Sequence, residues 1–144
     1  MKKDKKGFTL GELLVFLGIF SIVVMIGIPM FKSSFSRWEV TSGVRTVTSA
    51  LSTARYNAIK MNRSVKFCIE ENRILLKEKK GNEWETFFPF DVDEKVSLSI
   101  NSSPIFSSTG YVSPLCSIYV QNEHYRYKIT LSIAGRVKIV KLNL

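Results

Sequence analysis

The sequence predicts an α+β protein in which a long N-terminal helix precedes an antiparallel β domain. A nearly uninterrupted apolar run extends from Phe8 to Met30, and an apolar stripe of helical period continues to about Asn62. Beyond Asn62, short segments of alternating apolar and polar residues are separated by clusters of Asn, Gly, Ser and Pro, which is typical of hairpin-linked strands. With 144 residues, the chain has room for one small domain after the helix.

The apolar run is long enough to cross a membrane as a helix. Between Phe8 and Ile28, Glu12 is the only charged residue, and about 20 apolar residues span a bilayer. A secretory signal peptide would have a shorter apolar core and a small-residue cleavage site at its far end, where this chain continues with Pro29 and larger residues. The four lysines among the first six residues predict a cytoplasmic N-terminus and a C-terminal domain outside the cytoplasm.

Two residues of the apolar run are candidates for a special role. A carboxylate in hydrocarbon costs about 2.5–3.5 kcal/mol and is usually paired, so Glu12 is either functional or a tolerated interfacial residue of a plain anchor. Pro29 is expected to kink the helix, because proline removes a backbone hydrogen bond and clashes with the preceding turn. The alternative is that Pro29 ends the membrane helix.

The helix is expected to resume after Pro29 with one apolar face. Residues at spacings of three and four form this stripe: Val40, Val44, Val47, Leu51, Ala54 and Ala58. Polar and basic residues, among them Arg45 and Arg55, face elsewhere. Gly43 is expected to weaken the helix by about 1 kcal/mol relative to Ala.

Seven strands are expected in the β domain. They are residues 64–69, 73–79, 85–90, 96–100, 117–121, 126–133 and 137–142. Turns are expected at Asn72 and at the hairpin tips Gly81-Asn82 and Ala134-Gly135. Residues 101–104 and 107–110 are expected to form a looser polar connection.

The chain is basic, with a formal net charge of +9. The segment before Phe8 carries four lysines and one aspartate, so about six positive charges remain beyond it. Such a surface suits phosphate, anionic lipid or an acidic partner without selecting among them. One basic hairpin face is expected near the C-terminus, from Arg126, Lys128, Arg136, Lys138 and Lys141 with Tyr125 and Tyr127 interleaved. It would either hold a phosphate backbone or be a solvated strand face that blocks aggregation.

The two cysteines, Cys68 and Cys116, are expected in an extracytoplasmic domain, where a disulfide between them would stabilise the fold by about 4 kcal/mol. The competing interpretation is a buried free thiol, because Cys116 lies in an apolar stretch. Zinc-ligand spacing is missing, and no cofactor is expected.

No catalytic pattern occurs in the sequence, which argues against an enzyme. A nucleophile elbow, a phosphate loop and a metal triad are all missing. His124 is interpreted as a surface residue. The carboxylates Asp91, Asp93 and Glu94 lack the glycine turn and the ligand number of a calcium loop.

The stretch Lys5–Glu12 (KKGFTLGE) resembles the class III signal of type IV pilins and pseudopilins. The resemblance implies cleavage after Gly7 by a prepilin peptidase, N-methylation of Phe8, and pairing of Glu12 with the N-terminal amine of a neighbouring subunit. Pro29 stands where pilins commonly carry a helix-kinking proline. The implied organisation is a removed leader (1–7), a transmembrane and filament-core helix (8–30), an amphipathic continuation (31–62) and a β-rich domain (63–144).

Three further segments resemble the GspH/FimT-type minor pilins and pseudopilins. Residues 50–65 are similar to their AR..AI..N..V passage from helix to first strand, and residues 106–110 and 133–137 to their paired Gly-containing segments. Gly11 departs from the usual larger aliphatic residue before the glutamate. The stretch Gly135–Lys138 is similar to a DNA-contacting GRxR-like loop of some DNA-uptake members, with Lys138 in place of the second arginine.

The resemblance implies a minor pilin or pseudopilin of a type II secretion system or type IV pilus. Such a subunit sits at or near the filament tip and helps to prime assembly or contacts substrate. The alternative is a DNA-binding minor pilin for DNA uptake in natural transformation. A third interpretation, an unprocessed single-pass protein with a sensory β domain, leaves Gly7, Phe8 and Glu12 unexplained.

The implied location is the inner membrane, as a single-pass protein that assembles into a pilus or pseudopilus. The implied partners are a prepilin peptidase/N-methyltransferase, other minor and major pilins or pseudopilins, the inner membrane and, in some branches, secreted substrates or DNA.

Overall fold

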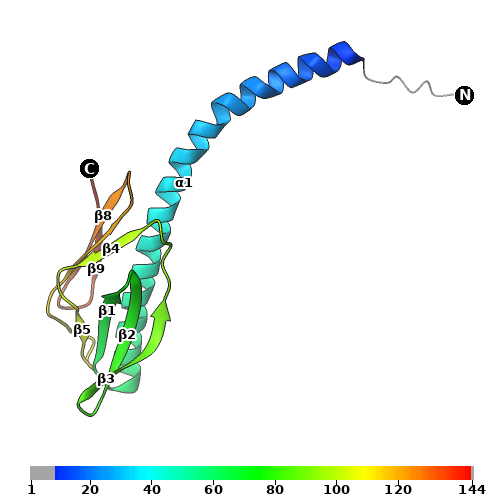
Figure 1. Ribbon diagram of the computed structural model, residues 1–144. Helices are drawn as coiled ribbons and strands as arrows, with labels where there is room; N and C mark the ends of the chain where they lie inside the picture. The colour runs from blue at the N-terminus through cyan, green and yellow to red at the C-terminus, as the bar shows by residue number, and fades with distance from the viewer. Residues whose placement is uncertain (1–8, 144) are drawn as a thin grey trace, which may run out of the picture. The chain divides into compact units, whose positions relative to one another are not determined.

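One long helix precedes all the strands of the described chain. The computed structural model describes residues 9–143, apart from the side chains of residues 29–33. Helix α1 runs from Leu10 to Met61, and strands β1 to β9 follow it (Figure 1). The chain divides into two compact units that meet between Phe35 and Ser36.

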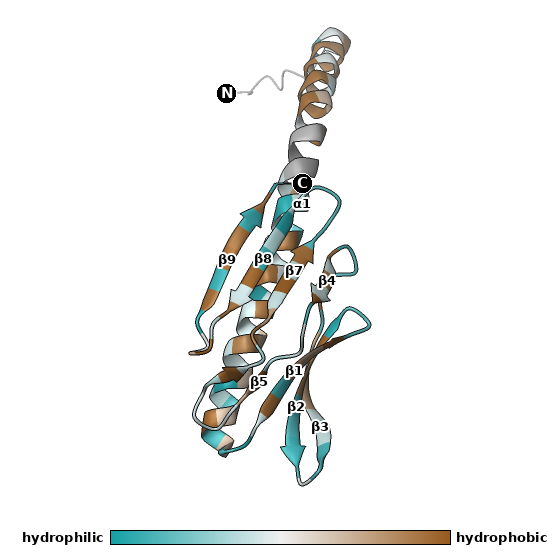
Figure 2. Ribbon diagram, turned by 90° about the vertical axis from the view of Figure 1, so that its left-hand side faces the viewer, coloured by the Kyte–Doolittle hydropathy of each residue, from teal (hydrophilic) through white to brown (hydrophobic). Residues whose placement is uncertain are grey.

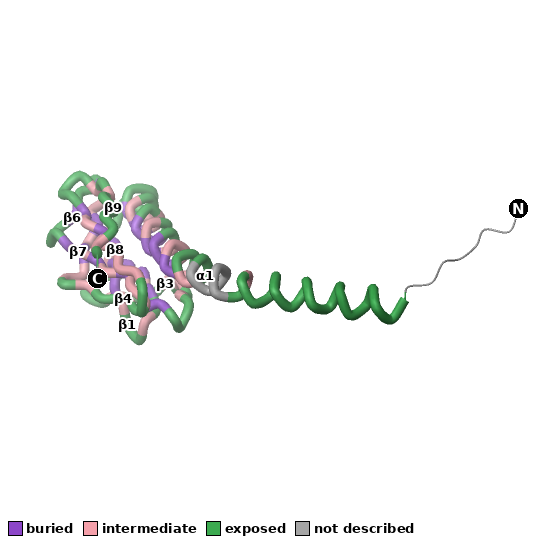
Figure 3. Tube along the Cα trace, turned by 90° about the horizontal axis from the view of Figure 1, so that it is seen from above, coloured by how far each residue is buried: buried purple, intermediate pink, exposed green. Residues whose placement is uncertain are grey.

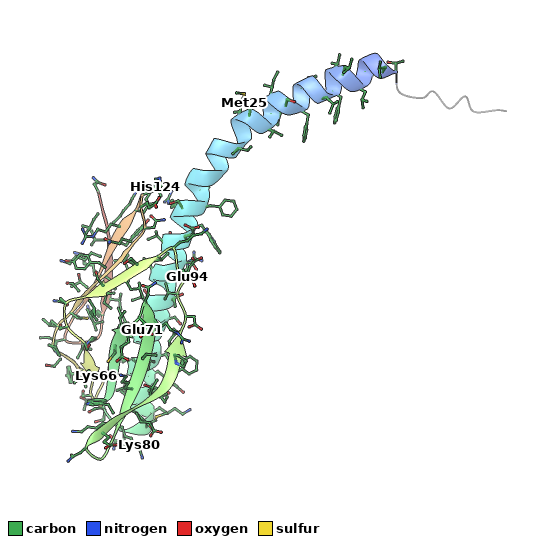
Figure 4. The ribbon with its side chains drawn as sticks, viewed as in Figure 1. Met25, Lys66, Glu71, Lys80, Glu94 and His124 are labelled. Carbon is green, nitrogen blue, oxygen red and sulfur yellow. The ribbon has the colours of Figure 1, made fainter. Side chains whose placement is uncertain are left out.

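The first unit is a helix without a core. Its side chains are exposed on all sides, with Leu10 at 78% and Met25 at 80% (Figures 3 and 4). The stretch Leu10–Ile28 is long and apolar enough to cross a membrane, judged by length and composition. The helix continues through position 29, so Pro29 does not end it, and the expected kink stays a prediction.

In the second unit, α1 buries one face. The predicted stripe is confirmed, because all six of its members are buried: Val40, Val44, Val47, Leu51, Ala54 and Ala58 (Figure 3). Arg45 and Ser52 are exposed on other sides of the helix. The apolar period of the sequence therefore decides which side of this segment packs.

The end of α1 is capped by its own backbone. Asn62 adopts a left-handed conformation (φ 51°), and its N–H donates to the carbonyl of Ile59 at 3.3 Å. The N–H of Arg63 donates to the carbonyl of Ala58 at 3.1 Å. This pair of bonds is a Schellman motif, for which asparagine is a suitable residue. The helix therefore ends within one residue of the predicted position.

The strands form two antiparallel sheets, which follow one another along the second-unit part of α1 (Figure 2). The first sheet has the order β3-β2-β1-β5-β6, with β1 Val65–Glu70, β2 Arg73–Lys80, β3 Glu83–Phe90, β5 Ile105–Phe106 and β6 Val112–Ser113. The second sheet has the order β4-β7-β8-β9, with β4 Ser97–Ile100, β7 Ser117–Gln121, β8 Arg126–Leu131 and β9 Val137–Leu142.

All seven predicted strands are present, with small shifts at their ends. The short strands β5 and β6 each follow one of the two segments predicted to be a loose connection, and neither was expected. Pairing creates them: β5 lies against β1, with Val65 opposite Phe106, and the N–H of Phe67 donates to the carbonyl of Pro104 at 2.9 Å. Such short ladders depend on a distant strand, which local propensity does not reveal.

The core lies between the stripe of α1 and the inner faces of both sheets. Its largest fully buried side chains from the strands are Phe67, Ile74, Leu76, Phe106, Ile118, Ile129 and Leu131. Each such side chain contributes about 1.5–3 kcal/mol on burial. All the residues of this cluster fall between Val40 and Leu131, so the second unit contains its own core.

Gly43 has a packing role that the sequence does not indicate. A Cβ at this position would lie 3.0 Å from Cγ1 of Val96 and 3.1 Å from Cγ1 of Val120. Helix α1 therefore approaches the second sheet at a distance that only glycine allows without displacing a valine. The expected weakening of the helix is offset by this close approach.

We predict that Gly43→Ala gives no net stabilisation and that Gly43→Val lowers the free energy of unfolding by about 1–3 kcal/mol, because the added carbons overpack the core. Urea unfolding of residues 36–144, followed by circular dichroism, measures both. Ser49→Ala, at an exposed position of the same helix, is the control. A gain of the full ~1 kcal/mol of helix propensity in Gly43→Ala would contradict the packing role.

Candidate functional site

Glu12 closes a hydrogen-bonded ring at the start of α1. Its carboxylate accepts from the backbone N–H of Thr9 at 2.9 Å and from the Thr9 hydroxyl at 3.0 Å. Its own N–H donates to the Thr9 hydroxyl oxygen at 3.3 Å. This is a capping box, which satisfies N–H groups that the first helical turn leaves unpaired. The Ser21 hydroxyl likewise donates to the carbonyl of Leu17 at 2.8 Å, so these polar groups are bonded inside the helix.

The expected processing site and partner of Glu12 lie outside the described residues. Gly7 and Phe8 precede residue 9, so cleavage between them stays a prediction. Both bonds from Thr9 to the carboxylate use Oε2 of Glu12. Within residues 9–143, Oε1 of Glu12 accepts no hydrogen bond. An ammonium group can therefore approach this oxygen without breaking an existing bond.

Three of the predicted cations share the outer face of the second sheet, the face turned away from the core. Along β8, Arg126 and Lys128 alternate with residues whose side chains point towards the core, and the buried Ile129 is one of these. In the β8–β9 register, Lys138 lies opposite Thr130, and directly opposed residues point to the same side. Arg126, Lys128 and Lys138 therefore form one surface, named the β8–β9 basic face.

The other members of the predicted surface lie elsewhere. Lys141 lies opposite Tyr127 in the register, on the inner side of the sheet, and its Nζ is 5.1 Å from the ring centroid of Tyr125. Arg136 lies at the hairpin tip, where its N–H donates to Oγ of Ser132 at 3.0 Å. Alternation along β9 turns Lys141 away from the basic face, and Tyr125 and Tyr127 pack against the core, so none of the three belongs to that face.

Tyr119 is the aromatic residue of the basic face, and sequence reasoning missed it. It lies opposite Lys128 in the β7–β8 register. Its ring centroid is 4.8 Å from Cζ of Arg126 and 5.8 Å from Nζ of Lys128. Both cations are thus held over one ring. The alternation of β7 places Tyr119 on the outer face, but only the pairing of β7 with β8 reveals its neighbours.

The two sheets differ in how their cations are neutralised. On the first sheet, Lys80 lies 2.6 Å from Glu85 and 3.3 Å from the buried Glu78. Hydrogen bonds to these two carboxylates raise the pKa of Lys80. Arg73 lies 2.7 Å from Asp91. Among the described residues of the second sheet, the basic face has no carboxylate partner.

Among solved structures, this architecture is shared with a minor pseudopilin and a minor pilin. The minor pseudopilin EpsH from the type 2 secretion system of Vibrio cholerae is 12% identical, and the match covers 72% of this chain and 97% of that chain with a TM-score of 0.61. The type IV minor pilin FimU of Pseudomonas aeruginosa is 12% identical, with 72% and 90% covered and a TM-score of 0.62. The chain has the pilin fold. These neighbours are structural proteins rather than enzymes.

The sequence matches curated proteins over a shorter stretch. Two fimbrial proteins of Pseudomonas aeruginosa are 44% identical to it over 57 residues, which is 40% of this chain. The match spans about a third of the length of these relatives, 36%. No protein-family model matches the chain.

The pilin fold brings the three minor-pilin-like segments together around Arg55. A Cβ at Gly135 would lie 3.1 Å from Cδ of Arg55, and a Cβ at Gly110 would lie 3.2 Å from its Nε. Both glycines have positive φ, 81° at Gly110 and 73° at Gly135. The Arg55 side chain from α1 therefore packs against two turns of the β domain that lie 25 residues apart in sequence.

A polar pocket of about 390 Å³ lies beside the start of the second unit. Its lining consists of Ser36, Glu39, Lys95, Asn122, Glu123 and His124 (Figure 4 labels His124). Asn122 Nδ2 donates to the carbonyl of Ser36 at 2.9 Å and to its Oγ at 2.8 Å. Lys95 lies 3.1 Å from Glu39, which raises the pKa of Lys95. The polar groups of this pocket thus mainly bind one another.

Asp91 and Asp93, whose sequence context lacks the features of a calcium loop, make contacts within the protein. Asp91 pairs with Arg73, and Asp93 accepts the backbone N–H of Lys95 at 3.0 Å, which closes a turn. Within residues 9–143, no group of His, Cys, Asp and Glu side chains is arranged to hold a metal ion.

Cys68 and Cys116 are both buried free thiols. Cys116 belongs to the core, whereas Cys68 alternates along β1 with the core residue Phe67 and lies on the other side of the sheet. The structure therefore has the free-thiol alternative rather than the disulfide. Burial raises the pKa of Cys116 from its usual 9.0 to about 11.

We predict that Cys116 resists iodoacetamide in the folded protein near neutral pH, because the reactive thiolate is rare and buried. In denaturant without reductant, mass spectrometry should find both cysteines alkylated. Failure of both to react there would establish a disulfide instead.

The same pKa sets a pH dependence of stability. The unfolded chain loses the Cys116 proton near its usual pKa of 9.0, whereas the folded chain keeps it until about pH 11. The raised pKa of the Cys116 thiol therefore adds to the free energy of unfolding. This contribution should be complete below pH 9 and be lost as the pH rises towards 11.

Proposed function

We propose that this chain is a minor subunit of a type IV pilus or of a type II secretion pseudopilus. The observation that carries the proposal is an apolar helix, exposed on all sides and with one carboxylate near its start, that continues into a domain with the pilin fold. Such a helix needs apolar surroundings. A membrane supplies them before assembly, and neighbouring helices of the same kind supply them in a filament.

In this proposal the helix is first a membrane anchor. Nineteen residues in Leu10–Ile28 rise by about 28 Å, close to the ~30 Å of a bilayer core. The basic leader 1–7 holds the N-terminus in the cytoplasm, and residues 8–30 cross the inner membrane once. A prepilin peptidase cuts after Gly7, and the new N-terminal Phe8 is methylated.

Glu12 then guides docking into the filament. Its capping contacts with Thr9 lower the cost of placing the carboxylate in the membrane. Oε1 is left to accept from the N-terminal amine of Phe8 of an adjacent subunit. Because this pairing forms only at one relative height of two helices, it selects the register of assembly.

The β domain supplies the contacts with the rest of the filament. We propose that this subunit lies at or near the tip, where it contacts other minor and major pilins or pseudopilins and helps to prime assembly or contacts a secreted substrate. The descriptions of EpsH and FimU as minor subunits support the assignment as a minor rather than a major subunit.

We predict that the full chain, coexpressed with a prepilin peptidase, loses residues 1–7 and gains one methyl group on Phe8. Intact-mass and N-terminal peptide analysis measure both. Gly7→Val should block cleavage, whereas Gly11→Ala, close by in the helix, should leave it unchanged. Glu12→Leu should be cleaved normally but fail to copurify with other subunits. An unprocessed Met1 in cells with active peptidase would falsify this proposal.

A second candidate function is DNA binding by the basic face. The observation that favours it is the pair of cations, Arg126 and Lys128, over the ring of Tyr119, with Lys138 beside them and no carboxylate partner among the described residues. Cations attract a phosphate backbone, and the partly exposed ring of Tyr119 lies beside them, where a base could contact its edge. In this interpretation Arg136 extends the surface to the hairpin tip.

We predict that, if DNA is the ligand, Arg126→Gln/Lys128→Gln weakens duplex binding and lowers the log–log salt slope by about 2. Arg136→Gln/Lys138→Gln tests the tip in the same way. Lys66→Gln/Lys79→Gln, which removes two cations from the first sheet, is the matched control. Fluorescence anisotropy across a salt series measures all four proteins. Equal losses in the three variants would mean nonspecific attraction by net charge.

A further inference from the structure

A small pocket lies between α1 and the tip of the β8–β9 hairpin. Its volume is about 250 Å³. The residues from α1 are Leu51, Ser52, Arg55, Tyr56 and Ile59, and those from the hairpin are Gly135 and Val137. It therefore combines one cation and two hydroxyl groups with aliphatic walls.

Arg55 is held in this pocket by backbone rather than by a charge partner. Its Cδ, Nε and Nη1 lie 3.1–3.2 Å from the place where a Cβ of Gly135 would stand. Gly110 approaches Nε and also Cδ1 of Ile59, at 3.2 and 3.0 Å from its Cβ position. Because the two turns confine the stem of Arg55, the guanidinium loses little further freedom when it binds a ligand.

The polar groups of the pocket are free to bind. Within residues 9–143, Arg55 forms no ion pair or hydrogen bond, and the hydroxyl groups of Ser52 and Tyr56 likewise have no hydrogen-bond partner. The sequence contains no Asp or Glu between Glu39 and Glu70, so this part of α1 offers no carboxylate. Lys60, with its Nζ 5.6 Å from the Tyr56 ring centroid, adds a second cation nearby.

We propose that this pocket binds a carboxylate group of a protein partner, carried by a peptide segment with an aliphatic side chain next to it. The guanidinium fork matches the two oxygens of a carboxylate, and the Ser52 and Tyr56 hydroxyls add donors. The adjacent aliphatic side chain packs on Ile59, which is 49% exposed, and on Val137.

The composition of the pocket favours a peptide over a nucleic acid. The basic face has three cations on two adjacent strands, Arg126 and Lys128 on β8 and Lys138 on β9, whereas this pocket has one confined cation surrounded by apolar walls. A phosphate backbone carries one charge at every repeat and no aliphatic group beside it. The proposal does not depend on membrane anchoring or on cleavage, so it can fail while the proposed function stands.

The test is an NMR titration of the full chain in detergent micelles, which follows the Nε–H signal of Arg55 and the backbone N–H signal of Gly135; the second signal also serves for variants without Arg55. Acetyl-leucyl-aspartyl amide tests a side-chain carboxylate, and acetyl-alanyl-leucine tests a terminal one. Acetyl-leucyl-asparaginyl amide is the uncharged control, and inorganic phosphate and a short DNA oligonucleotide represent the other anions. We expect saturable shifts with at least one carboxylate peptide and none with the asparagine peptide.

Three variants separate the pocket from general charge effects. Arg55→Lys keeps the charge but loses the fork, and should weaken binding about tenfold. Ser52→Asp places a carboxylate three residues before Arg55 on an exposed helix position, so it should occupy the guanidinium and abolish binding without disturbing the core. Arg45→Lys, on the same helix and also exposed, should bind as the unmodified chain does.

The proposal is overturned if neither carboxylate peptide gives a saturable shift at about 10 mM. It is also overturned if the asparagine peptide binds equally well or if Ser52→Asp keeps the affinity. Binding of phosphate or of the oligonucleotide at Arg55, without binding of the peptides, would assign the pocket to a phosphate ligand and reject the peptide.

Discussion

The packing of one face of α1 against both sheets is the contact on which the β domain depends. The stripe from Val40 to Ala58 supplies one wall of a core whose other wall comes from two separate sheets. Gly43 sets the closest approach to the second sheet, through Val96 and Val120. Two asparagines complete the arrangement: Asn72 binds the backbone of Val96, just before β4, and of Leu98 in β4, and Asn122 binds Ser36. The helix thus has to be amphipathic where it meets the sheets and apolar on all sides where it does not.

Regions of the surface of this domain differ in whether their cations are paired with carboxylates. Three cations of the first sheet, Arg73, Lys77 and Lys80, are paired with carboxylates. The basic face and Arg55 have no carboxylate partner in the described part of the chain. A cation held by an aromatic ring or by two glycine turns keeps its hydrogen-bonding capacity for a partner. Cations without a carboxylate partner are therefore present at both places where binding is proposed.

In the proposed function, Glu12 combines a local capping role with pairing to a neighbouring subunit. The capping box with Thr9 makes the carboxylate part of its own helix, which explains how an acidic residue is accommodated in an apolar stretch. Because Oε2 makes both contacts, the proposed pairing with a neighbouring amine does not require the cap to break. Membrane residence and assembly are then compatible states of the same residue rather than competing ones.

The sequence by itself determined the helix, its buried stripe, its end near Asn62 and the seven main strands, because hydrophobic periodicity and turn residues are local signals. It also singled out Glu12 and the glycine-containing segments 106–110 and 133–137 as candidates for a special role. Tertiary structure alone decided the rest. Strand register placed Tyr119 beside Arg126 and put Lys141 on the opposite side of the sheet from the basic face. Strand β5 exists because its residues pair with β1. The contacts of Gly43 and Arg55 join segments far apart in the chain, and no local pattern encodes such distances.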